Sequence, residues 1–596
     1  MSSFYSDASL VMIPSGYKTS KVYSAKPTDG AGDLVFTRSN DTATRVGPDG
    51  LIEKVRTNLL LQSNTFSTTW LPLSGGAVTG GQSGYDGTNN AWLLSKSAAG
   101  GFIYQTANSF NGQYTLSIYA KANASTHIRV NGNAITDGDA FFNLSTGAIQ
   151  SSTNCVAEIV SVGGGWYRCS ITSTDADLDF VNIYPAEASG ISATSGSVFI
   201  QDAQLEKGDI ATDYIATTTA AVSVGPVANV PRLDFLGSSC PRLLLEPQRQ
   251  NLALFSESFD NAAWNKVQSS ATANQMTSPS GYQDADLLIE NTVNSSHSTN
   301  NNAGITSTAG IHTASAFFKK NTKNFGFIQI ATDGAANRYT AVIDLVNGTI
   351  TNTATLGSPT STSNSIVDYG NGWYRVSVSA QHTSSTLFIV CGLSNSATPT
   401  YSATAYPTYI GNGTDSIGLW GAQLELGSYA SSYVNTLGAA VTRGAESASK
   451  TGIASLIGQS EGTLFADFEF NGNYDIGGNI PINIYTGNSE AYIFISGAGS
   501  LFLDIVVAGV LSARISGAIG AVGRKKIAFA YKANDFVGYM NGIQIGTDTS
   551  GSVGAMGSLS VGAYKNTGYS TTGGVNQALL FKARLENDDL AALTAL

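Results

Sequence analysis

Two acidic side chains stand two residues apart in the segment FADFEF, at Asp467 and Glu469. Residues i and i+2 of a β-strand lie on the same face, so the two carboxylates would project together. A retaining glycosidase needs two carboxyl groups about 5–5.5 Å apart, and an inverting one needs about 6.5–9.5 Å. The flanking residues do not extend the pair to E-x-D-x-E or E-x-D-x-x-E, and its place near the start of a domain indicates an edge strand. We therefore favour binding over hydrolysis.

Histidine and cysteine are scattered and form no recognisable catalytic or metal-binding motif. The four histidines fit no HExxH pattern, and the four cysteines show no CxxC spacing. The turns TDGDA (136–140) and YDGTNN (85–90) carry several oxygen ligands, which Ca²⁺ prefers. Ordinary polar turns are the favoured interpretation, so no cofactor is predicted and Ca²⁺ is the alternative. Four buried free thiols are expected, at Cys155, Cys169, Cys240 and Cys391.

Glu206 and Glu425 occupy the same place in two related segments, DAQLEKGDIATDYI and GAQLELGSYASSYV. Alternation within AQLE puts leucine on one face of a strand and glutamate on the other. An arginine recurs in step with each glutamate, in two GWYR motifs, at Arg168 and Arg375. We therefore predict two structural ion pairs, Glu206 with Arg168 and Glu425 with Arg375. Removal of one partner from a buried pair costs about 3–5 kcal/mol.

The two glutamate segments close two copies of a long internal repeat. The same blocks occur in the same order in each copy, including RTNLLLQSNTF with RQNLALFSESF, YTLSIYAK with HTASAFFK, and VGGGWYR with YGNGWYR. The blocks alternate apolar and polar residues, which predicts short β-strands, and glycine-containing turns separate them. Strands at this spacing predict a sandwich or jelly roll. We expect one module at 56–220 and a second at 249–440.

Four tryptophans fall at matched positions of the repeat, Trp70 with Trp264 and Trp166 with Trp373. Such aromatic side chains could stack on sugars, but a tryptophan can also bury about 150–250 Å² in a core. Trp166 and Trp373 lie inside alternating strands, which favours core packing. We therefore predict structural roles for the four tryptophans, as for the two Glu–Arg pairs.

The pattern of strands in residues 451–596 predicts a third sandwich that differs from the two repeated modules. The dipeptide Asn541-Gly542 stands between two strands and is a strong signal for a two-residue hairpin. Near the end of the chain, Asn587 is a candidate N-cap for a short helix, with Asp588 and Asp589 in its first turn.

Two regions outside these domains are short and irregular. Residues 1–55 are polar with little periodicity, so we expect them to become ordered only on a partner surface. Residues 221–248 are rich in proline and predict an extended linker between the modules.

Composition excludes several classes of protein. Charged residues make up only 12% of the 596 residues, the net charge is −11, and no basic run occurs, which argues against a nucleic-acid surface. The first residues lack the basic start and apolar core of a signal peptide, and no apolar run has the length of a membrane span. We therefore expect assembly in a cytoplasm.

Several quoted segments resemble a family of phage virion proteins. The resemblance is carried by SLVMIPSGYKTSKVYS, DLVFTRSNDTATRVGPDGLIEKV, NVPRLDF and CPRLLLEPQRQNLALFSESFDNAAW. In that family these pieces lie close together before a sandwich similar to carbohydrate-binding modules, which implies that the first module here is inserted or duplicated. The last domain is similar to concanavalin A-like lectin/glucanase and laminin-G sandwiches, through KKIAFAYKANDFVGYMNGIQIGTD and ARLENDDLAAL.

The resemblance implies an all-β, multidomain chain: an N-terminal virion-attachment segment, two tandem jelly-roll sandwiches and a concanavalin-like β-sandwich. It implies a non-enzymatic tail or head fibre that presents lectin-like domains to host-surface polysaccharide, located in the virion. The alternatives are a capsid-decorating or connector protein that binds only other virion proteins, and a polysaccharide depolymerase. The implied partners are other virion proteins, copies of the same chain in a homo-oligomer such as a trimer, and host-surface polysaccharide.

Overall fold

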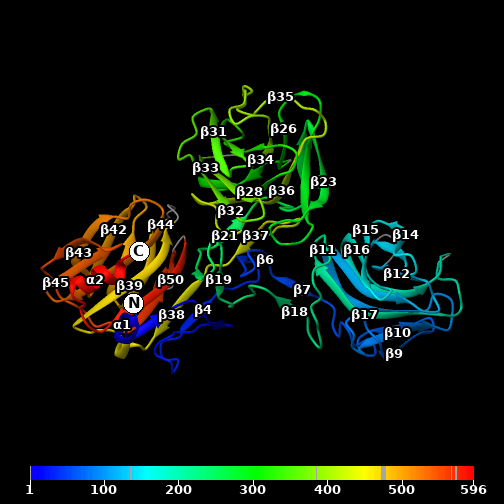
Figure 1. Cartoon of the computed structure of the whole chain (residues 1–596), viewed down its shortest axis with the longest axis horizontal. Helices are drawn as coiled ribbons and strands as arrows, with labels where there is room; N and C mark the ends of the chain where they lie inside the picture. The colour runs from blue at the N-terminus through cyan, green and yellow to red at the C-terminus, as the bar shows by residue number, and fades with distance from the viewer. Residues whose placement is uncertain are drawn as a thin grey trace. The chain divides into compact units, whose positions relative to one another are not determined.

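The computed structural model describes residues 2–133, 137–188, 190–301, 303–383, 386–470, 478–565, 567–570 and 573–596. Nearly all of its regular elements are β-strands, and the helices α1 (Ser2–Asp7) and α2 (Asn587–Thr594) lie at the two ends of the chain (Figure 1). The predicted all-β class with several sandwiches is confirmed. Unit 1 comprises Met1–Lys54 with Pro226–Leu596, and unit 2 comprises Val55–Gly225.

One β-sandwich of unit 1, termed the scaffold sandwich, takes strands from both ends of the chain. Its first sheet has the order β19 (Arg232–Asp234), β20 (Arg242–Leu244), β50 (Gly574–Phe581), β39 (Glu461–Phe470), β44 (Gly523–Lys532), β45 (Asp535–Met540), β46 (Ile543–Asp548), with β1 (Leu10–Met12) on β50. Its second sheet has the order β2 (Tyr17–Lys18), β3 (Lys21–Val22), β4 (Leu34–Thr37), β38 (Ser447–Thr451), β47 (Ser558–Val561), β40 (Asn479–Thr486), β41 (Ser489–Ile495), β42 (Ser500–Val507), β43 (Val510–Ala518). Short additional elements are β5 (Arg45–Val46) with β6 (Ile52–Glu53), β48 (Ala563–Tyr564) with β49 (Thr567–Ser570), and the 3₁₀ turn η2 (Ala454–Leu456).

The N-terminal region does not need a separate partner to become ordered, contrary to the expectation from its composition. Strand β1 pairs with β50, so that Leu10 lies opposite Leu580, and β4 pairs with β38, so that Phe36 lies opposite Ala448. Leu10 and Phe36 are fully buried. The C-terminal part of the same chain supplies the surface, and Figure 1 shows both chain ends at this sandwich.

The expected extended linker also belongs in part to this sandwich. Strand β20 pairs with β50, placing Leu243 opposite Val575, and β19 pairs with β20. Leu243 is fully buried in the core between the two sheets. The prediction of a simple spacer is therefore wrong for β19 and β20.

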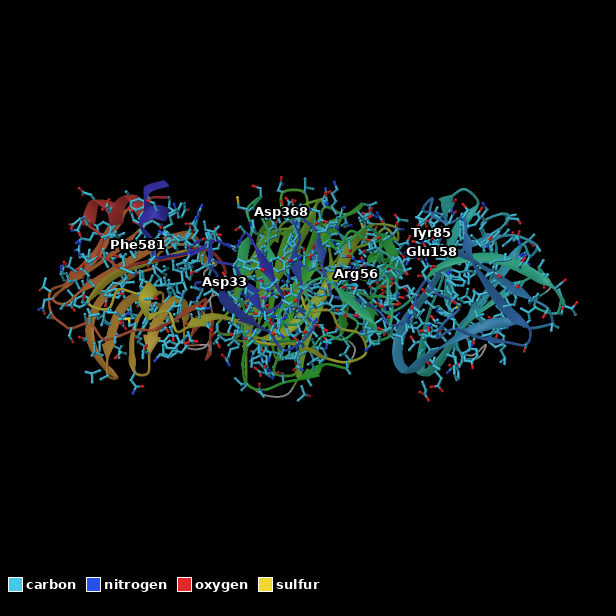
Figure 2. All side chains as sticks on the ribbon, turned by 90° about the horizontal axis from the view of Figure 1, so that it is seen from below. Asp33, Arg56, Tyr85, Glu158, Asp368 and Phe581 are labelled. Carbon is cyan, nitrogen blue, oxygen red and sulfur yellow. The ribbon has the colours of Figure 1, made fainter. Side chains whose placement is uncertain are left out.

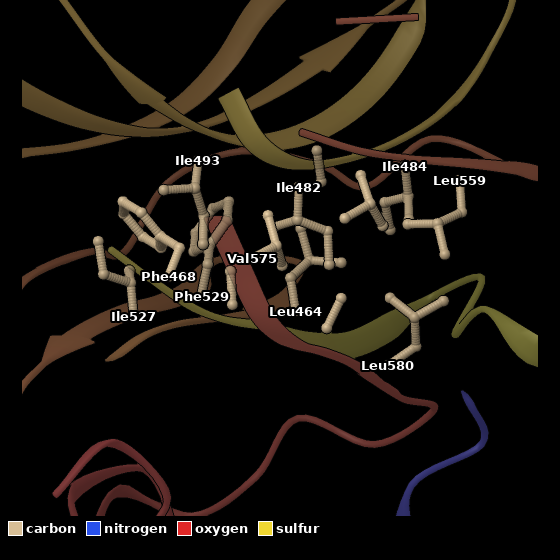
Figure 3. Packing of buried hydrophobic residues seen from close by; sticks show 14 of the residues in the cluster. Leu464, Phe468, Ile482, Ile484, Ile493, Ile527, Phe529, Leu559, Val575 and Leu580 are labelled. Carbon is tan, nitrogen blue, oxygen red and sulfur yellow. The ribbon is translucent and has the colours of Figure 1, made fainter. Parts of the chain in front are cut away.

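The core of the scaffold sandwich fills the space between its two sheets (Figure 3). Alternate residues of β39 point inward, and Leu464 and Phe468 pack there with Ile482, Phe529 and Val575. Burial of one such side chain contributes about 1.5–3 kcal/mol relative to exposure. The intervening residues of β39 therefore point to the opposite face of the first sheet.

That opposite face is covered at one end by the terminal segments of the chain. Leu590 and Leu593 of α2 pack with Val11 and Phe581, the last of which is labelled in Figure 2. The terminal helix is present as predicted, but its N-cap is Glu586 rather than Asn587, without a side-chain capping bond. Among the described residues, no helix has the length and hydropathy to cross a membrane.

The predicted hairpin at Asn541-Gly542 is confirmed. Strands β45 and β46 pair so that Met540 lies opposite Ile543, which leaves two residues in the turn. Both turn residues have positive φ, 51° for Asn541 and 81° for Gly542. This is the backbone that a type I′ turn requires, and asparagine and glycine adopt it at low cost.

Unit 2 contains the first module, whose two layers are linked by very long strands. Its main order is β14 (Ala148–Thr153), β13 (Asp139–Asn143), β12 (His127–Asn131), β16 (Trp166–Ala186), β11 (Phe102–Ala122), β17 (Gly196–Lys207), β10 (Ala91–Lys96), β9 (Gly76–Gln82). The edge strands β15 (Val156–Gly163) and β8 (Leu71–Leu73) pair with β16 and β11. Strands β11 and β16 are each 21 residues long and take part in both layers.

The second module, in unit 1, repeats this arrangement with the long strands divided. One sheet has the order β22 (Trp264–Val267), β26 (His297–Asn301), β34 (Thr386–Ser394), β29 (Phe325–Thr332), β30 (Asn337–Asp344), β31 (Thr349–Leu356), with β27 (Ile305–Thr306) on β34. The other has the order β23 (Ser269–Met276), β24 (Ala285–Glu290), β36 (Ser416–Leu426), β28 (Gly310–Lys320), β33 (Trp373–His382), β32 (Ser363–Asp368). A small pair, β25 (Asn294–Ser295) and β35 (Tyr409–Ile410), lies outside them.

Each module is held at its base by a two-stranded stem that brings its two ends together. In the first module β7 (Arg56–Asn58) pairs with β18 (Val222–Val224), and in the second β21 (Arg249–Asn251) pairs with β37 (Val441–Arg443). Adjacent ends are the usual geometry of a domain inserted into another. The chain is thus a scaffold sandwich interrupted twice in series by homologous modules.

Candidate functional site: a polar cleft beside the second module

The repeated glutamate of the second module closes a loop. The Glu425 carboxylate accepts hydrogen bonds from Gln423 Nε2 at 2.6 Å, from the Ser431 N–H at 2.9 Å and from Ser431 Oγ at 2.6 Å. Arg375 donates to the Ser431 carbonyl at 2.6 Å and to Ser315 Oγ at 3.1 Å. The return loop 427–432 is therefore fastened to the sheet at Ser431.

The first module contains the same arrangement. Glu206 accepts hydrogen bonds from Gln204 Nε2 at 2.8 Å, from the Thr212 N–H at 2.8 Å and from Thr212 Oγ1 at 2.6 Å. Arg168 donates to the Thr212 carbonyl at 2.6 Å and to Ser117 Oγ at 3.0 Å. The contact set has been kept through the duplication, with threonine in place of serine.

The prediction of two ion pairs is therefore wrong, because each glutamate and its arginine bond to a third residue, Thr212 or Ser431, and not to each other. Neither Glu206 with Arg168 nor Glu425 with Arg375 is among the ion pairs within 4.0 Å that the described residues form. The arginine that approaches Glu425 is Arg249 of the stem, with 3.9 Å from Nε to the carboxylate. The sequence pattern found residues that act together, but they meet on the backbone of a third residue.

The four repeated tryptophans are buried, with exposed fractions of 1–3%. Trp70 donates to the Gln62 carbonyl at 3.3 Å, and Trp264 donates to the matching Phe255 carbonyl at 3.0 Å. Trp373 donates to the Thr277 carbonyl at 2.9 Å, and Trp166 lies beside aromatic neighbours in the first module. Their faces are used for packing and are not available to stack on a sugar.

A cleft of about 590 Å³ lies in unit 1 between the outer face of the second module and the scaffold sandwich. The module contributes strands β32 and β33 and the return loop, while β19, β20 and the end of β39 form the opposite wall. Its lining is rich in hydroxyl groups and includes Arg375 and Glu469. The residues that line it are Asp234, Leu236, Arg242, Leu244, Glu246, Ser363, Asn364, Ser365, Val367, Tyr369, Arg375, Ser377, Ser379, Ser428, Tyr429, Ala430, Ser431, Ser432, Glu469, Val522, Gly573 and Gly574.

Two carboxylates of the scaffold wall, Asp234 and Glu246, are neutralised by arginines of the same protein. Arg242 donates to the Asp234 carboxylate through Nε and Nη2, at 3.1 Å each. Glu246 accepts from the Ser432 N–H at 2.8 Å and from Ser432 Oγ at 2.5 Å. Burial alone would raise the pKa of Glu246, but the guanidinium groups of Arg443 and Arg232 hold it well below its usual range.

Glu246 is one member of a buried charge cluster at the base of the second module. Glu446 accepts from Arg38 Nη1 and Arg232 Nε, at 2.7 Å each, and Arg232 also pairs with Glu246 at 2.7 Å. Arg443 pairs with Glu246 at 3.1 Å. Because these residues come from both sides of the inserted module, the cluster fixes the junction, and none of them lies within a repeat block. Sequence reasoning missed it, since no local spacing joins residues 38 and 446.

Arg375 differs from Arg242, the other arginine in the lining of the cleft, because its charge is not matched by a carboxylate. It is 5% exposed, and its guanidinium lies 5.4 Å from the centre of the Phe317 ring. Within the part of the chain that the structure describes, its Nε–H has no hydrogen-bond acceptor. The neighbouring Tyr369 has a pKa raised by burial, an effect that the Arg375 charge partly offsets.

Asp467 and Glu469 do not form an available catalytic pair. Strand β39 lies between β44 and β50, so the prediction of an edge strand is wrong. Asp467 is fully buried, accepts from Arg524 Nε at 2.8 Å and Nη2 at 2.5 Å, and accepts from Asn576 at 3.1 Å. Its oxygens are occupied by this bidentate ion pair, while Glu469 lines the cleft.

The two acidic turns use their carboxylates within the protein. Asp86 accepts from the Thr88 N–H at 3.0 Å and from Thr88 Oγ1 at 2.8 Å, and Asp139 accepts from Arg129 at 2.6 Å. Thr136 of the second turn lies outside the described residues. Among those that are described, no three His, Cys, Asp or Glu side chains gather in a way that could hold a metal ion.

The cysteines are free, but only two have the expected full burial. Cys169 and Cys391 are buried, which raises the pKa of both thiols, whereas Cys155 is half-buried. Cys240 is exposed, so the expectation of burial is wrong at this position. It follows a tight turn between β19 and β20, where a side chain has no core to enter.

No protein-family model matches the sequence, and a search of curated proteins found no match. Among solved structures, the N-terminal CBM22-1-CBM22-2 tandem domain of Xyn10C from Paenibacillus barcinonensis matches with 11% identity, 62% of this chain, 96% of that chain and a TM-score of 0.20. Domains LG4-5 of the mouse laminin alpha1 chain match with 9% identity, 46% and 83% coverage and a TM-score of 0.17. Domain 4 of AbnA, a GH43 extracellular arabinanase from Geobacillus stearothermophilus, matches with 12% identity, 25% and 73% coverage and a TM-score of 0.22. At these identities and TM-scores the similarities say nothing about what this chain binds.

Proposed function

We propose that this chain is a non-enzymatic structural protein of a bacteriophage virion, a tail or head fibre that presents sandwich domains to polysaccharide on the host surface. The observation that carries the proposal is the architecture: one sandwich that holds both chain ends and displays two homologous modules on stems. The resemblance of the segments around residues 10–54 and 229–264 to phage virion proteins supports the virion location.

The chemistry of the carboxylates supports display over cleavage. The strongest acidic candidate, Asp467, is held by Arg524 and Asn576. Glu206 and Glu425 are used to fasten loops in two different modules. Asp467, Glu206 and Glu425 therefore have structural partners, while Glu469 lines the cleft.

The described N-terminal residues have a role that refines the expected attachment segment. Strands β1 and β4 are paired within the scaffold sandwich, so attachment to the virion would use a folded surface of unit 1 rather than a free arm. Other virion proteins and further copies of this chain are the proposed partners at that surface.

The proposal is tested on purified particles of the phage that encodes the chain, together with the full-length protein. Mass spectrometry of density-purified virions should detect the chain at a defined copy number. The isolated protein should bind host polysaccharide without releasing reducing ends. Absence of the chain from purified virions would overturn the virion role, and sustained release of reducing ends would overturn the non-enzymatic role.

A further inference from the structure

The outer face of the second module carries rows of hydroxyl groups that lead into the cleft. On the paired strands β32 and β33, Ser363 lies opposite Ser379 and Ser365 lies opposite Ser377. Alternate residues of β33 pack in the module core, so these serines point away from it. Each of the four serines lines the cleft. The Ser379 hydroxyl is already bonded to Thr313 Oγ1 at 2.7 Å and to the Ser428 carbonyl at 3.3 Å, so Ser363, Ser365 and Ser377 supply the hydroxyl groups of this face that can meet a ligand.

Arg375 lies on the same face of β33 as Ser377, which comes two residues later in the strand. It is nine-tenths buried, it lines the cleft, and its Nε–H has no acceptor among the residues that the structure describes. It also takes no part in the ion pairs within 4.0 Å that those residues form. A buried guanidinium without a matching anion is costly, and an acceptor bearing negative charge would offset that cost.

We propose that this cleft binds a carboxylated sugar unit, with Arg375 facing the carboxylate and the serine rows facing the sugar hydroxyls. The inference rests on the proposed function and names the ligand class and the site. Guanidinium groups match the geometry of carboxylates, and bonds between these charged groups are stronger than neutral ones. The cleft volume of about 590 Å³ lies within the range of small-molecule sites, about 300–1,000 Å³.

The first module provides an internal comparison at the same strand positions. Arg168 of β16 lies opposite Val160 of β15. In the same way, Arg375 of β33 lies opposite Val367 of β32. This register aligns the edge strands residue by residue. Ser363, Asn364, Ser365 and Tyr369 of the second module therefore correspond to Val156, Ala157, Glu158 and Val162 of the first.

These replacements remove the features that the ligand would need. Val156 is 72% exposed and offers no hydrogen bond, and Glu158, labelled in Figure 2, places a negative charge where the second module has Ser365. A carboxylate at this position would repel an anionic sugar. The site therefore belongs to the second module alone, although both modules keep the arginine and its loop.

The test exchanges the residues at this one position in the full-length chain. Ser365→Glu introduces the first module's carboxylate into the cleft at an exposed edge-strand residue, and Glu158→Ser is the matched control in unit 2. Each protein is titrated calorimetrically with trigalacturonate and sialyllactose, and with their uncharged counterparts galactotriose and lactose. An aspartate-rich peptide serves as the probe for an acidic protein partner. Thermal unfolding verifies that both variants fold.

We expect the wild-type chain to bind at least one of the two acidic sugars more tightly than its neutral counterpart. Ser365→Glu should weaken that binding at least tenfold, and Glu158→Ser should leave it unchanged. Failure of both acidic sugars to bind, equal loss in both variants, or binding of the peptide in place of the sugars would overturn the inference. Binding of the neutral sugars alone would also overturn it while leaving glycan display by the virion protein intact.

Discussion

Glu425 and Arg375 are joined through Ser431 rather than to each other. The Glu425 carboxylate accepts hydrogen bonds from the Ser431 N–H at 2.9 Å and from the Ser431 hydroxyl at 2.6 Å. Arg375 donates to the Ser431 carbonyl at 2.6 Å. One loop residue therefore has its backbone N–H and C=O and its hydroxyl satisfied by two charged side chains of the sheet. The same relation joins Glu206 and Arg168 through Thr212.

Glu425→Ala should destabilise the second module by roughly 3–5 kcal/mol. The change leaves the Ser431 N–H, the Ser431 hydroxyl and the Gln423 amide without their buried acceptor, and each unsatisfied group costs about 1–3 kcal/mol. Urea unfolding and hydrogen exchange of residues 427–432 measure the effect. Glu206→Ala should give the same local loss at residues 209–213. Unchanged exchange in both loops would contradict this account of the glutamates.

Glu446→Ala should be among the most disruptive single changes at the junction of the second module. Arg38 and Arg232 would lose their shared carboxylate while remaining fully buried, which costs about 3–5 kcal/mol. The matched control is Glu53→Ala, because the partly exposed Arg45–Glu53 pair at 2.7 Å should contribute only about 0–1 kcal/mol. Equal losses of unfolding free energy in the two variants would contradict the assigned role of the buried cluster.

The stability of the second module should fall as pH rises from about 4 to about 7. Burial raises the pKa of Asp286 to about 7, an effect that the Asn274 N–H partly opposes, so the folded state binds a proton that the unfolded state has already released. The free energy of unfolding is therefore greatest below the pKa that Asp286 has in the unfolded state. It falls as the pH rises through the pKa of Asp286 in the folded state, with a total change on the order of a few kcal/mol.

Hydrogen exchange of β24 measured between pH 4 and pH 8, corrected for the intrinsic exchange rate, checks this dependence. Asp286→Asn carries no titrating group and should flatten the profile. The turn residue Asp344 provides the control, since its pKa is lowered by hydrogen bonds in an exposed turn and Asp344→Asn should leave the profile's shape between pH 5 and pH 8 unchanged. Rising stability across pH 4–7 in the unmodified protein would show that the sign is wrong.

Asp467→Asn should alter stability and leave no catalytic signature. Its carboxylate makes two hydrogen bonds to Arg524, and loss of its charge weakens an ion pair that is buried on one side and 47% exposed on the other. We expect a loss of roughly 1–2 kcal/mol in unfolding free energy. Reducing-end assays on host polysaccharide should give the same background for the variant and the unmodified chain. A reducing-end signal that is present in the unmodified chain and absent in the variant would support the alternative function, a polysaccharide depolymerase.

The repeat shows which parts of this structure are readable from sequence. Strand alternation, the Asn541-Gly542 hairpin and the two matched GWYR strands depend on residues close together in the chain, and the structure contains them. The pairing of Leu10 with Leu580 spans almost the whole chain, and no local pattern announces it. The edge-strand assignment for Asp467 was wrong for the same reason, because β50 and β44 come from later in the sequence.

The cleft could not be predicted from the sequence for a related reason. Its serines are common residues in a strand pattern, and only Arg375 and Glu469 carried a recognisable signal. The matching positions Glu158 and Ser365 could have been compared once the repeat was aligned, but the wall formed by β19 and β20 depended on the supposed linker joining a sheet. Tertiary pairing, rather than residue type, creates this site.

Immunogold electron microscopy of intact virions, with an antibody against residues 451–596, tests the central claim most directly. The account predicts gold on a projecting tail or head appendage, with labelling blocked by the purified full-length chain. Gold confined to the capsid shell would make the chain a decorating protein. Gold absent from every projecting appendage would contradict the fibre assignment.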